Sequence, residues 1–163
     1  MPQWKKNVMV FFVAFFIIDV TYSMVMPFLP LFLERDLGVT SAAEVKLWNG
    51  LIYGASYLTM ILFGPLWGWL GDKYGRKSMV LRSGIGLTIS MFLMTYATNA
   101  WQLLLLRLLN GALSGYFPAA NAMTAASAPP DKVGSALGTN MAGAMAGTVL
   151  GPVVGGVLIS FMP

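Results

Sequence analysis

The sequence predicts an all-α integral membrane protein with five transmembrane helices, and three observations support that prediction. Of its 163 residues, 57% are hydrophobic and only 10% are charged, whereas a soluble domain carries about 25% charged residues. Its six acids and ten bases are too few to surround an apolar core of this size with a polar shell. Apolar stretches of about 20 residues, the length that crosses a hydrocarbon layer, recur along the chain. The solvent of most of its surface is therefore lipid.

The predicted spans follow one another with short connections. Charged residues, Pro or Trp bound them at about 8–33, 48–70, 78–98, 101–126 and 134–161. The first span contains Asp19, the fourth contains Arg107, and the fifth has no charge. The first span also fits a secretory signal, since two lysines precede it. The acid inside it, the lack of a small-x-small cleavage site after it and the four later spans oppose that alternative.

Basic residues in the connections predict the topology. Placing the amino terminus and the connections after the second and fourth spans on one side leaves only Arg35 and Lys46 for the other side. The bases that gather together are Lys5, Lys6, Lys73, Arg76, Lys77, Arg82 and Lys132. Because cytoplasmic loops are enriched in Lys and Arg, we expect a multi-pass protein of the cell membrane with a cytoplasmic amino terminus. This topology accounts for the net charge of +4, so nucleic acid is not an expected partner.

A short internal repeat relates the second and fifth spans. Residues 64–68 and 151–155 both read Gly-Pro-x-x-Gly. Pairing these two spans fits a three-helix unit repeated with inverted topology. Such a repeat requires a sixth helix, so we expect residues 1–163 to be one partial amino-terminal domain.

The fifth span carries a stripe of small residues. Gly143, Gly147, Gly151 and Gly155 recur in steps of four, which places them on one side of a helix. The stripe allows another helix to approach backbone to backbone. Pro152 removes one backbone donor and predicts a kink or hinge, so static packing and bending both remain open.

Asp19 is an acid near the middle of an apolar span. It lies about eleven residues, or roughly 17 Å, into the span, where a carboxylate costs on the order of 3 kcal/mol. We therefore expect it to face a wet cavity, to pair with a base or to hold a proton. Each arrangement suits a proton carrier, and an ion pair that only joins two helices is the structural alternative.

Three further residues are candidates for a cavity. Arg107 either lines the same cavity as Asp19 or extends its stem to the outer interface. Tyr22 and Met26 are candidate wall residues, because Met and aromatic side chains accept many shapes. The chain has no His and no Cys, which excludes the usual zinc sites and Cys or His catalysis. We expect no metal, no cofactor and no enzyme activity.

Four segments resemble signatures of one transporter family. The connection 68–77, Gly-Trp-Leu-Gly-Asp-Lys-Tyr-Gly-Arg-Lys, resembles the Gly-x-Leu-Ala-Asp-Arg-x-Gly-Arg-Lys loop of the major facilitator superfamily. Residues 107–111 resemble its fourth-helix Arg-x-x-x-Gly motif. Residues 147–156 are similar to the fifth-helix signature of its drug:proton antiporters, and residues 27–30 resemble the Pro-x-x-Pro ending of their first helix.

The resemblance implies five helices of an incomplete six-helix amino-terminal half of a major facilitator fold. It implies proton-coupled export of lipophilic drugs, cations among them, by alternating access. A cytoplasmic gate would consist of Gly68, Asp72, Lys73, Gly75, Arg76 and Lys77. Gly147, Gly151, Pro152, Gly155 and Gly156 would seal or bend at the interface between the transporter's halves. Arg107 would contribute to proton coupling, whereas the role of Asp19 rests on its depth.

The partners implied are the lipid bilayer, protons, a small lipophilic substrate and the remainder of the transporter. Two alternatives stay open. One is proton-coupled uptake of a small polar solute, which the scarcity of polar residues in the spans opposes. The other is a membrane partner protein that does not transport.

Overall fold

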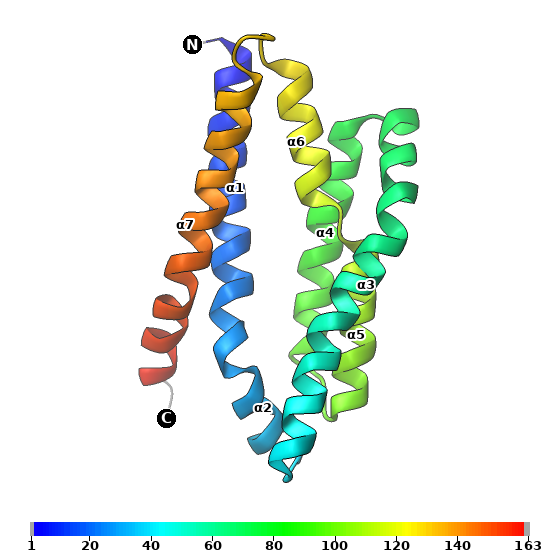
Figure 1. Ribbon diagram of the computed structural model, residues 1–163, viewed down its shortest axis with the longest axis vertical. Helices are drawn as coiled ribbons and strands as arrows, with labels where there is room; N and C mark the ends of the chain where they lie inside the picture. Colours follow the sequence, from blue (N-terminus) through cyan, green and yellow to red (C-terminus); the bar gives the residue numbers. More distant parts are fainter. Residues whose placement is uncertain (1, 162–163) are drawn as a thin grey trace. The chain divides into compact units, whose positions relative to one another are not determined.

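The computed structural model describes residues 2–161, and within that range it is helical without β-strands (Figure 1). The chain divides into two compact units, each built around its own helix contacts. The first unit comprises residues 1–28 and 120–163, and the second comprises residues 29–119. The two units are described separately below.

The first unit contains α1 (Gln3–Val25), the 3₁₀ turn η1 (Met26–Phe28), most of α6 (Tyr116–Ser127) and α7 (Val133–Ser160). The second unit contains α2 (Leu29–Arg35), α3 (Ala42–Tyr74), α4 (Arg76–Met94), α5 (Ala100–Leu113) and the start of α6.

Two of the predicted spans are interrupted helices. The first span consists of α1, η1 and α2, and Pro27 and Pro30 lie at the interruption, where each removes a backbone donor. The fourth span consists of α5 and α6, and Gly115 between them adopts φ 126°, a conformation that favours glycine. The other spans are single helices whose ends lie within a few residues of the predicted ones, apart from the early start of α3 at Ala42.

Within residues 2–161, four stretches have the length and composition to cross a membrane: Gln3–Arg35, Ala42–Tyr74, Ala100–Ser127 and Val133–Ser160. The predicted third span corresponds to α4, which carries three bases in its first two turns and is not among the four. A crossing by α4 therefore stays a prediction. The outward-facing side chains fit lipid, since large apolar residues such as Ile61, Leu105 and Val149 are exposed.

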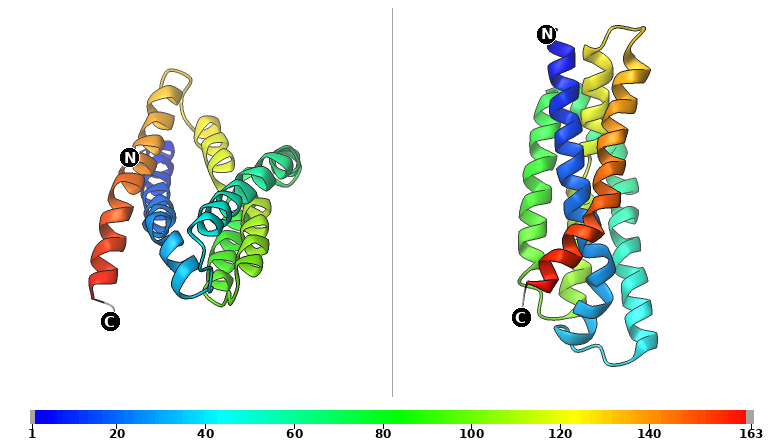
Figure 2. Two further views of the ribbon diagram at one scale, coloured as in Figure 1. Left: turned by 60° about the horizontal axis from the view of Figure 1, so that its bottom comes forward. Right: turned by 90° about the vertical axis from the view of Figure 1, so that its left-hand side faces the viewer.

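In the first unit α1 and α7 lie side by side along most of their length (Figure 2). In the second unit α3 packs chiefly against α5 and also against α4. The first span thus pairs with the fifth, and the second pairs with the fourth. An inverted repeat of three helices makes these two pairs equivalent, so the pairing favours the predicted repeat.

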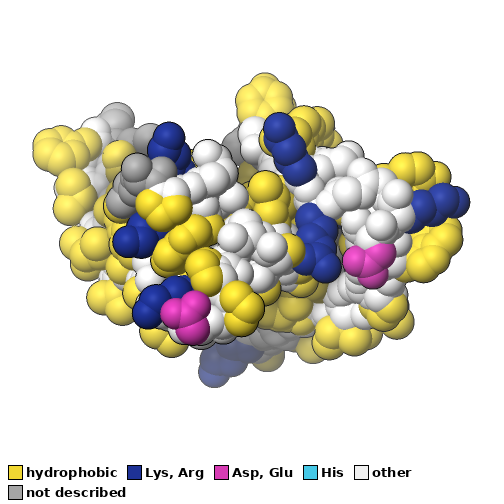
Figure 3. Space-filling model, turned by 90° about the horizontal axis from the view of Figure 1, so that it is seen from above, with side chains coloured by type: hydrophobic (Ala, Val, Ile, Leu, Met, Phe, Trp, Pro, Cys, Tyr) yellow, Lys and Arg dark blue, Asp and Glu magenta, His cyan; other side chains and the backbone are white. Residues whose placement is uncertain are grey.

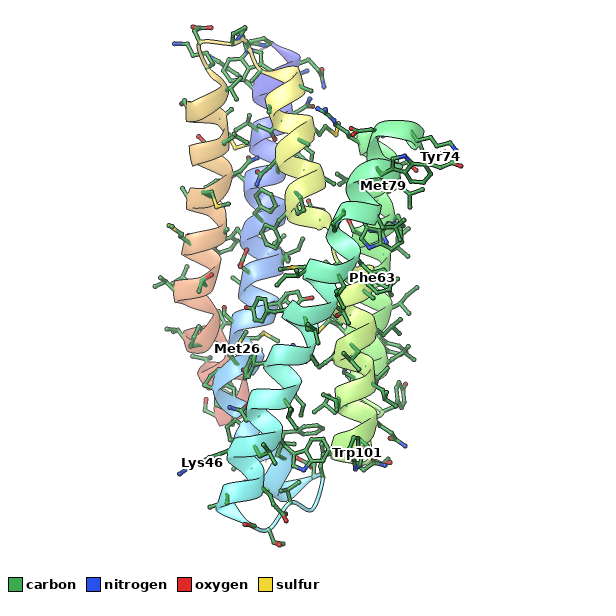
Figure 4. All side chains as sticks on the ribbon, turned by 45° about the vertical axis from the view of Figure 1, so that its right-hand side comes forward. Met26, Lys46, Phe63, Tyr74, Met79 and Trp101 are labelled. Atoms are coloured by element: carbon green, nitrogen blue, oxygen red, sulfur yellow. The ribbon has the colours of Figure 1, made fainter. Side chains whose placement is uncertain are left out.

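The core of the second unit lies at the end where α3 begins. It consists of Leu29, Leu33, Val39, Val45, Ile52, Met94, Ala100 and Leu103. Beside it Trp48 and Trp101 make an edge-to-face contact with ring centroids 4.9 Å apart, and Figure 4 shows Trp101 at the start of α5. At the opposite end of the unit is the turn between α3 and α4. The face seen from above shows several Lys and Arg side chains and few acids (Figure 3).

Candidate functional site

The glycine stripe of α7 forms a seam with α1 in the first unit. A Cβ atom built on Gly143, Gly147, Gly151 or Gly155 would come within 3.0 Å of backbone atoms of α1. The carbonyls approached belong, in order, to Phe12, Phe16, Val20 and Met24. Steps of four on one helix meet steps of four on the other, and only hydrogen fits between them. The predicted backbone-to-backbone approach is confirmed, and the partner helix is α1.

Pro152 and Gly156, which belong to the antiporter signature but not to the stripe, differ from the four stripe glycines. A Cβ atom on Gly156 would meet nothing within 4 Å, and Pro152 is exposed. The helix continues through Pro152 to Ser160, and its red end turns away from the line of its first turns in Figure 2 (right). A role of the antiporter signature at the interface between halves stays a prediction, and Gly156 has open space for such a contact.

Asp19 lies at this seam. A Cβ atom on Gly147 would stand 2.8 Å from the Asp19 Cβ, so the acid and the stripe are in direct contact. The Thr148 hydroxyl of α7 donates to Asp19 Oδ1 at 3.4 Å. Asp19 Oδ2 is buried and accepts no hydrogen bond from residues 2–161. Within the described part of the first unit no base forms an ion pair with Asp19, so the helix-joining pair is not made there.

Ser23 is a member of the seam that sequence reasoning missed. Its buried hydroxyl lies 2.6 Å from the Asp19 carbonyl and 3.1 Å from the Gly147 carbonyl. It therefore links the turn that carries Asp19 to α7. The available signal was a small polar residue four positions after the acid, on the same helix face.

A second missed cluster joins α6 to α7. The Asn140 amide donates to Thr124 Oγ1 at 2.9 Å and to Asn121 Oδ1 at 3.4 Å. Asn140 and Thr124 are fully buried. Polar side chains on facing helices stabilise packing in a membrane by about 0.6 kcal/mol per hydrogen bond on average.

Arg107 lies in the second unit, on α5. It is 5% exposed, so its side chain lies inside the protein and does not extend over a free surface to the interface. Ser56 of α3 donates to the Arg107 carbonyl at 3.0 Å. A Cβ atom on Gly111 would overlap the Ser56 carbonyl and the Thr59 hydroxyl. At Gly111 of the Arg-x-x-x-Gly segment, α5 therefore packs closely against α3, one turn from the buried Arg107. A cavity shared by Arg107 and Asp19 stays a prediction.

Asn110 makes a further interhelical contact in the second unit. Its amide donates to Ser90 Oγ of α4 at 2.7 Å, and both side chains are buried. The contact joins α5 to α4 three residues after Arg107.

The predicted gate residues surround the turn from α3 to α4, between the labelled Tyr74 and Met79 in Figure 4. The helix α3 ends at Tyr74 and α4 begins at Arg76, so the reversal depends on Gly75 alone, which adopts φ 91°. Gly71 lies inside α3, where it is buried and close to Met79.

All six members of the predicted gate set are exposed at this end of the unit. The exposed members are Gly68, Asp72, Lys73, Gly75, Arg76 and Lys77. The Lys73 ammonium lies over the rings of Trp69 and Tyr74, at 5.2 and 5.4 Å from their centroids. Exposed charges at a tight turn suit a contact with another part of a transporter, and the gate role stays a prediction.

The two candidate wall residues lie near the end of α1. Tyr22 is on its last full turn and Met26 begins η1, and both are partly exposed. Figure 4 shows Met26 at this interruption. Their contact with a substrate stays a prediction.

A profile of the Major Facilitator Superfamily matches residues 11–163. The chain belongs to the Major Facilitator Superfamily. This superfamily consists of transporters, and the helices described above are those of a multi-pass membrane protein.

Within this superfamily, the chain is similar to curated proteins named for multidrug resistance. The chain is 46% identical over 137 residues to the multidrug resistance protein MdtG of Salmonella paratyphi A, which covers 84% of this chain and 34% of that protein. It is 46% identical over 142 residues to MdtG of Klebsiella pneumoniae, covering 87% and 34%. It is 46% identical over 156 residues to MdtG of Enterobacter lignolyticus, and the match covers 96% of this chain and 37% of that protein. This major facilitator chain thus spans about a third of the length of the relatives it matches.

Proposed function

We propose that this chain is the amino-terminal part of a proton-coupled exporter of lipophilic drugs that works by alternating access. The observation that carries the proposal is the position of Asp19, an acid at membrane depth in contact with the glycine stripe of the drug:proton antiporter signature. The similarity to proteins named for multidrug resistance supports the same substrate class.

The seam suits a carboxyl group that gains and loses a proton. With its charge, Asp19 accepts the Thr148 hydroxyl on Oδ1 while Oδ2 has no donor among the described residues. A proton placed on Oδ2 removes a charge that is costly in a membrane. The close α1–α7 contact transmits a local change at Asp19 to α7, because no side chain separates the two backbones.

The proposal includes the place and orientation of the protein. It lies in the cell membrane with its amino terminus in the cytoplasm, where the exposed gate residues dock the other half of the transporter. Protons and a small lipophilic compound, cations included, are its transported partners.

The test uses a fusion of residues 1–163 to the part of MdtG of Klebsiella pneumoniae beyond the matched region. Cells that express the fusion are expected to expel a fluorescent lipophilic cation, and collapse of the proton gradient is expected to stop this. Asp19→Asn is expected to abolish efflux while the amount of protein in the membrane is unchanged. Asp131→Asn, which neutralises an exposed acid, is the matched control and is expected to leave efflux intact.

Two results would contradict the proposal. If the Asp19→Asn fusion expels the cation at the rate of the control, Asp19 is not needed for proton coupling. Accumulation of a polar solute down an inward proton gradient, with no drug efflux, would favour uptake instead.

A further inference from the structure

The interruption of the fourth span creates a local problem in hydrogen bonding. The helix α5 ends at Leu113, α6 begins at Tyr116, and Gly115 between them has φ 126°. Carbonyl groups at the end of a helix have no partner within it. In a membrane interior no bulk water replaces that partner. Other side chains must therefore bind these carbonyls.

Trp67 of α3 supplies one donor. Its indole nitrogen donates to the Ala112 carbonyl at 2.6 Å. The indole has a single N–H group, and in this arrangement it is committed to the last turn of α5.

Arg82 of α4 supplies a second donor, to a carbonyl within the interruption itself. Its Nη2 atom donates to the Ser114 carbonyl at 3.2 Å. Its guanidinium carbon lies 3.4 Å from the centroid of the Trp67 ring, a stacking distance for a planar cation on an aromatic face. The two side chains thus support each other and bind carbonyls two residues apart.

The sequence places Arg82 in the predicted cytoplasmic set of bases, and the structure adds contacts that this assignment alone does not require. Its Nε and Nη1 atoms are buried and make no hydrogen bond to the described residues. Gly115 lies against it, since a Cβ atom there would be 3.4 Å from Nη2 and 3.7 Å from the Trp67 Cβ. A base whose only role is to keep a loop in the cytoplasm does not require this position between Trp67 and Gly115.

We propose that Arg82 and Trp67 are positioning residues that maintain the interruption at Ser114–Gly115. They fix the direction of α5, which carries Arg107, relative to the first turn of α6. Without them, the Ala112 carbonyl regains a partner only if the end of α5 rewinds toward Tyr116, and the Ser114 carbonyl only if this end unwinds to reach another donor, because Pro118 four positions on has no N–H. Either change alters the relation between the two helices. This inference concerns the second unit alone and does not depend on the direction or substrate of transport.

Spin-label distance measurements on the full chain in lipid nanodiscs test the proposal. The sequence contains no Cys, so Leu105→Cys on α5 and Ala119→Cys on α6 place two labels without background. In the parent chain we expect one narrow distance distribution. Arg82→Gln and Trp67→Phe are both expected to broaden or shift it.

Two matched controls remove equivalent groups elsewhere in the unit. Trp69→Phe removes an exposed indole two residues from Trp67, and Lys46→Gln removes an exposed base near the start of α3. Both are expected to retain the parent distribution. Melting curves by circular dichroism accompany every variant, because a purely structural role lowers the melting temperature and leaves the distance unchanged.

Trp67→Phe decides the outcome if Arg82→Gln fails to fold. It retains an aromatic face for Arg82 and removes the N–H that binds Ala112. A Trp67→Phe distribution that matches Trp69→Phe overturns the proposal, whether or not Arg82→Gln folds. A broadened or shifted distribution with the melting temperature of the controls supports it.

Discussion

Ser23 on α1 and Gly151 on α7 share one small space at the seam of the first unit. A Cβ atom at Gly151 would overlap the Ser23 hydroxyl oxygen, which itself lies 3.1 Å from the Gly147 carbonyl. The absence of a side chain at Gly151 is therefore what allows the hydroxyl on α1 to reach the backbone of α7. The same relation brings the Asp19 turn against the stripe.

Gly151→Ala is expected to destabilise the first unit, because its methyl group displaces Ser23 or forces the helices apart. Overpacking of this kind costs about 1–3 kcal/mol. The measurement is the thermal unfolding of the full chain in detergent, followed by circular dichroism. Gly156→Ala is the matched control, since a Cβ atom on Gly156 would meet nothing within 4 Å. Equal melting temperatures for the two variants would show that the seam does not depend on Gly151.

Gly111→Ala is expected to separate α5 from α3 in the second unit. The added methyl group would overlap the Ser56 carbonyl and the Thr59 hydroxyl, and Ser56 would lose its bond to the Arg107 carbonyl. We expect a loss of about 1–3 kcal/mol and faster proteolysis at the interruption of the fourth span. Gly54→Ala on α3, where a Cβ atom meets nothing within 4 Å, should be neutral or slightly stabilising, because Ala is about 1 kcal/mol better than Gly in a helix. A Gly111→Ala protein as stable as this control contradicts the prediction.

Asn110 and Ser90 are expected to be energetically coupled. Their hydrogen bond of 2.7 Å is buried between α5 and α4, and such bonds in membrane proteins contribute about 0.6 kcal/mol on average and up to about 1.7 kcal/mol. A double-mutant cycle with Asn110→Ala and Ser90→Ala, read by reversible unfolding in detergent, measures the coupling. The exposed pair Gln3 and Asn7, with a 3.3 Å bond, is the control and is expected to show coupling near zero. A coupling near zero for both pairs would contradict the prediction.

Single cysteines are expected to report the orientation of the helices. Asp131→Cys adjoins Lys132, one of the predicted cytoplasmic bases, whereas Ser41→Cys lies between α2 and α3, in a connection predicted to be outside. A maleimide that cannot cross membranes should label Ser41→Cys in intact cells and Asp131→Cys only after permeabilisation. The opposite pattern would show that the topology is inverted. Labelling of both positions in intact cells would show that one of the predicted crossings between them does not occur.

Composition and pattern were enough to predict most of the fold. A chain with 10% charged residues cannot make a soluble surface, and long apolar stretches must become helices, because a helix satisfies its own backbone in lipid. Steps of four glycines predicted a close helix contact on α7, and the observed contact with α1 confirms it. The loop and helix signatures predicted the superfamily, which the matching profile confirms.

Only the tertiary structure decided which helices and which polar side chains come together. The sequence showed Asp19 and Gly147 as separate features, and their contact follows from the register of α1 on α7, which depends on every residue along both faces. Arg82 counted as a topological base, and only the fold places it over Trp67 at the interruption near Gly115. A periodic pattern depends on neighbours within one helix and is local. Partner choice and register depend on packing between distant segments, so they are decided only when the helices assemble.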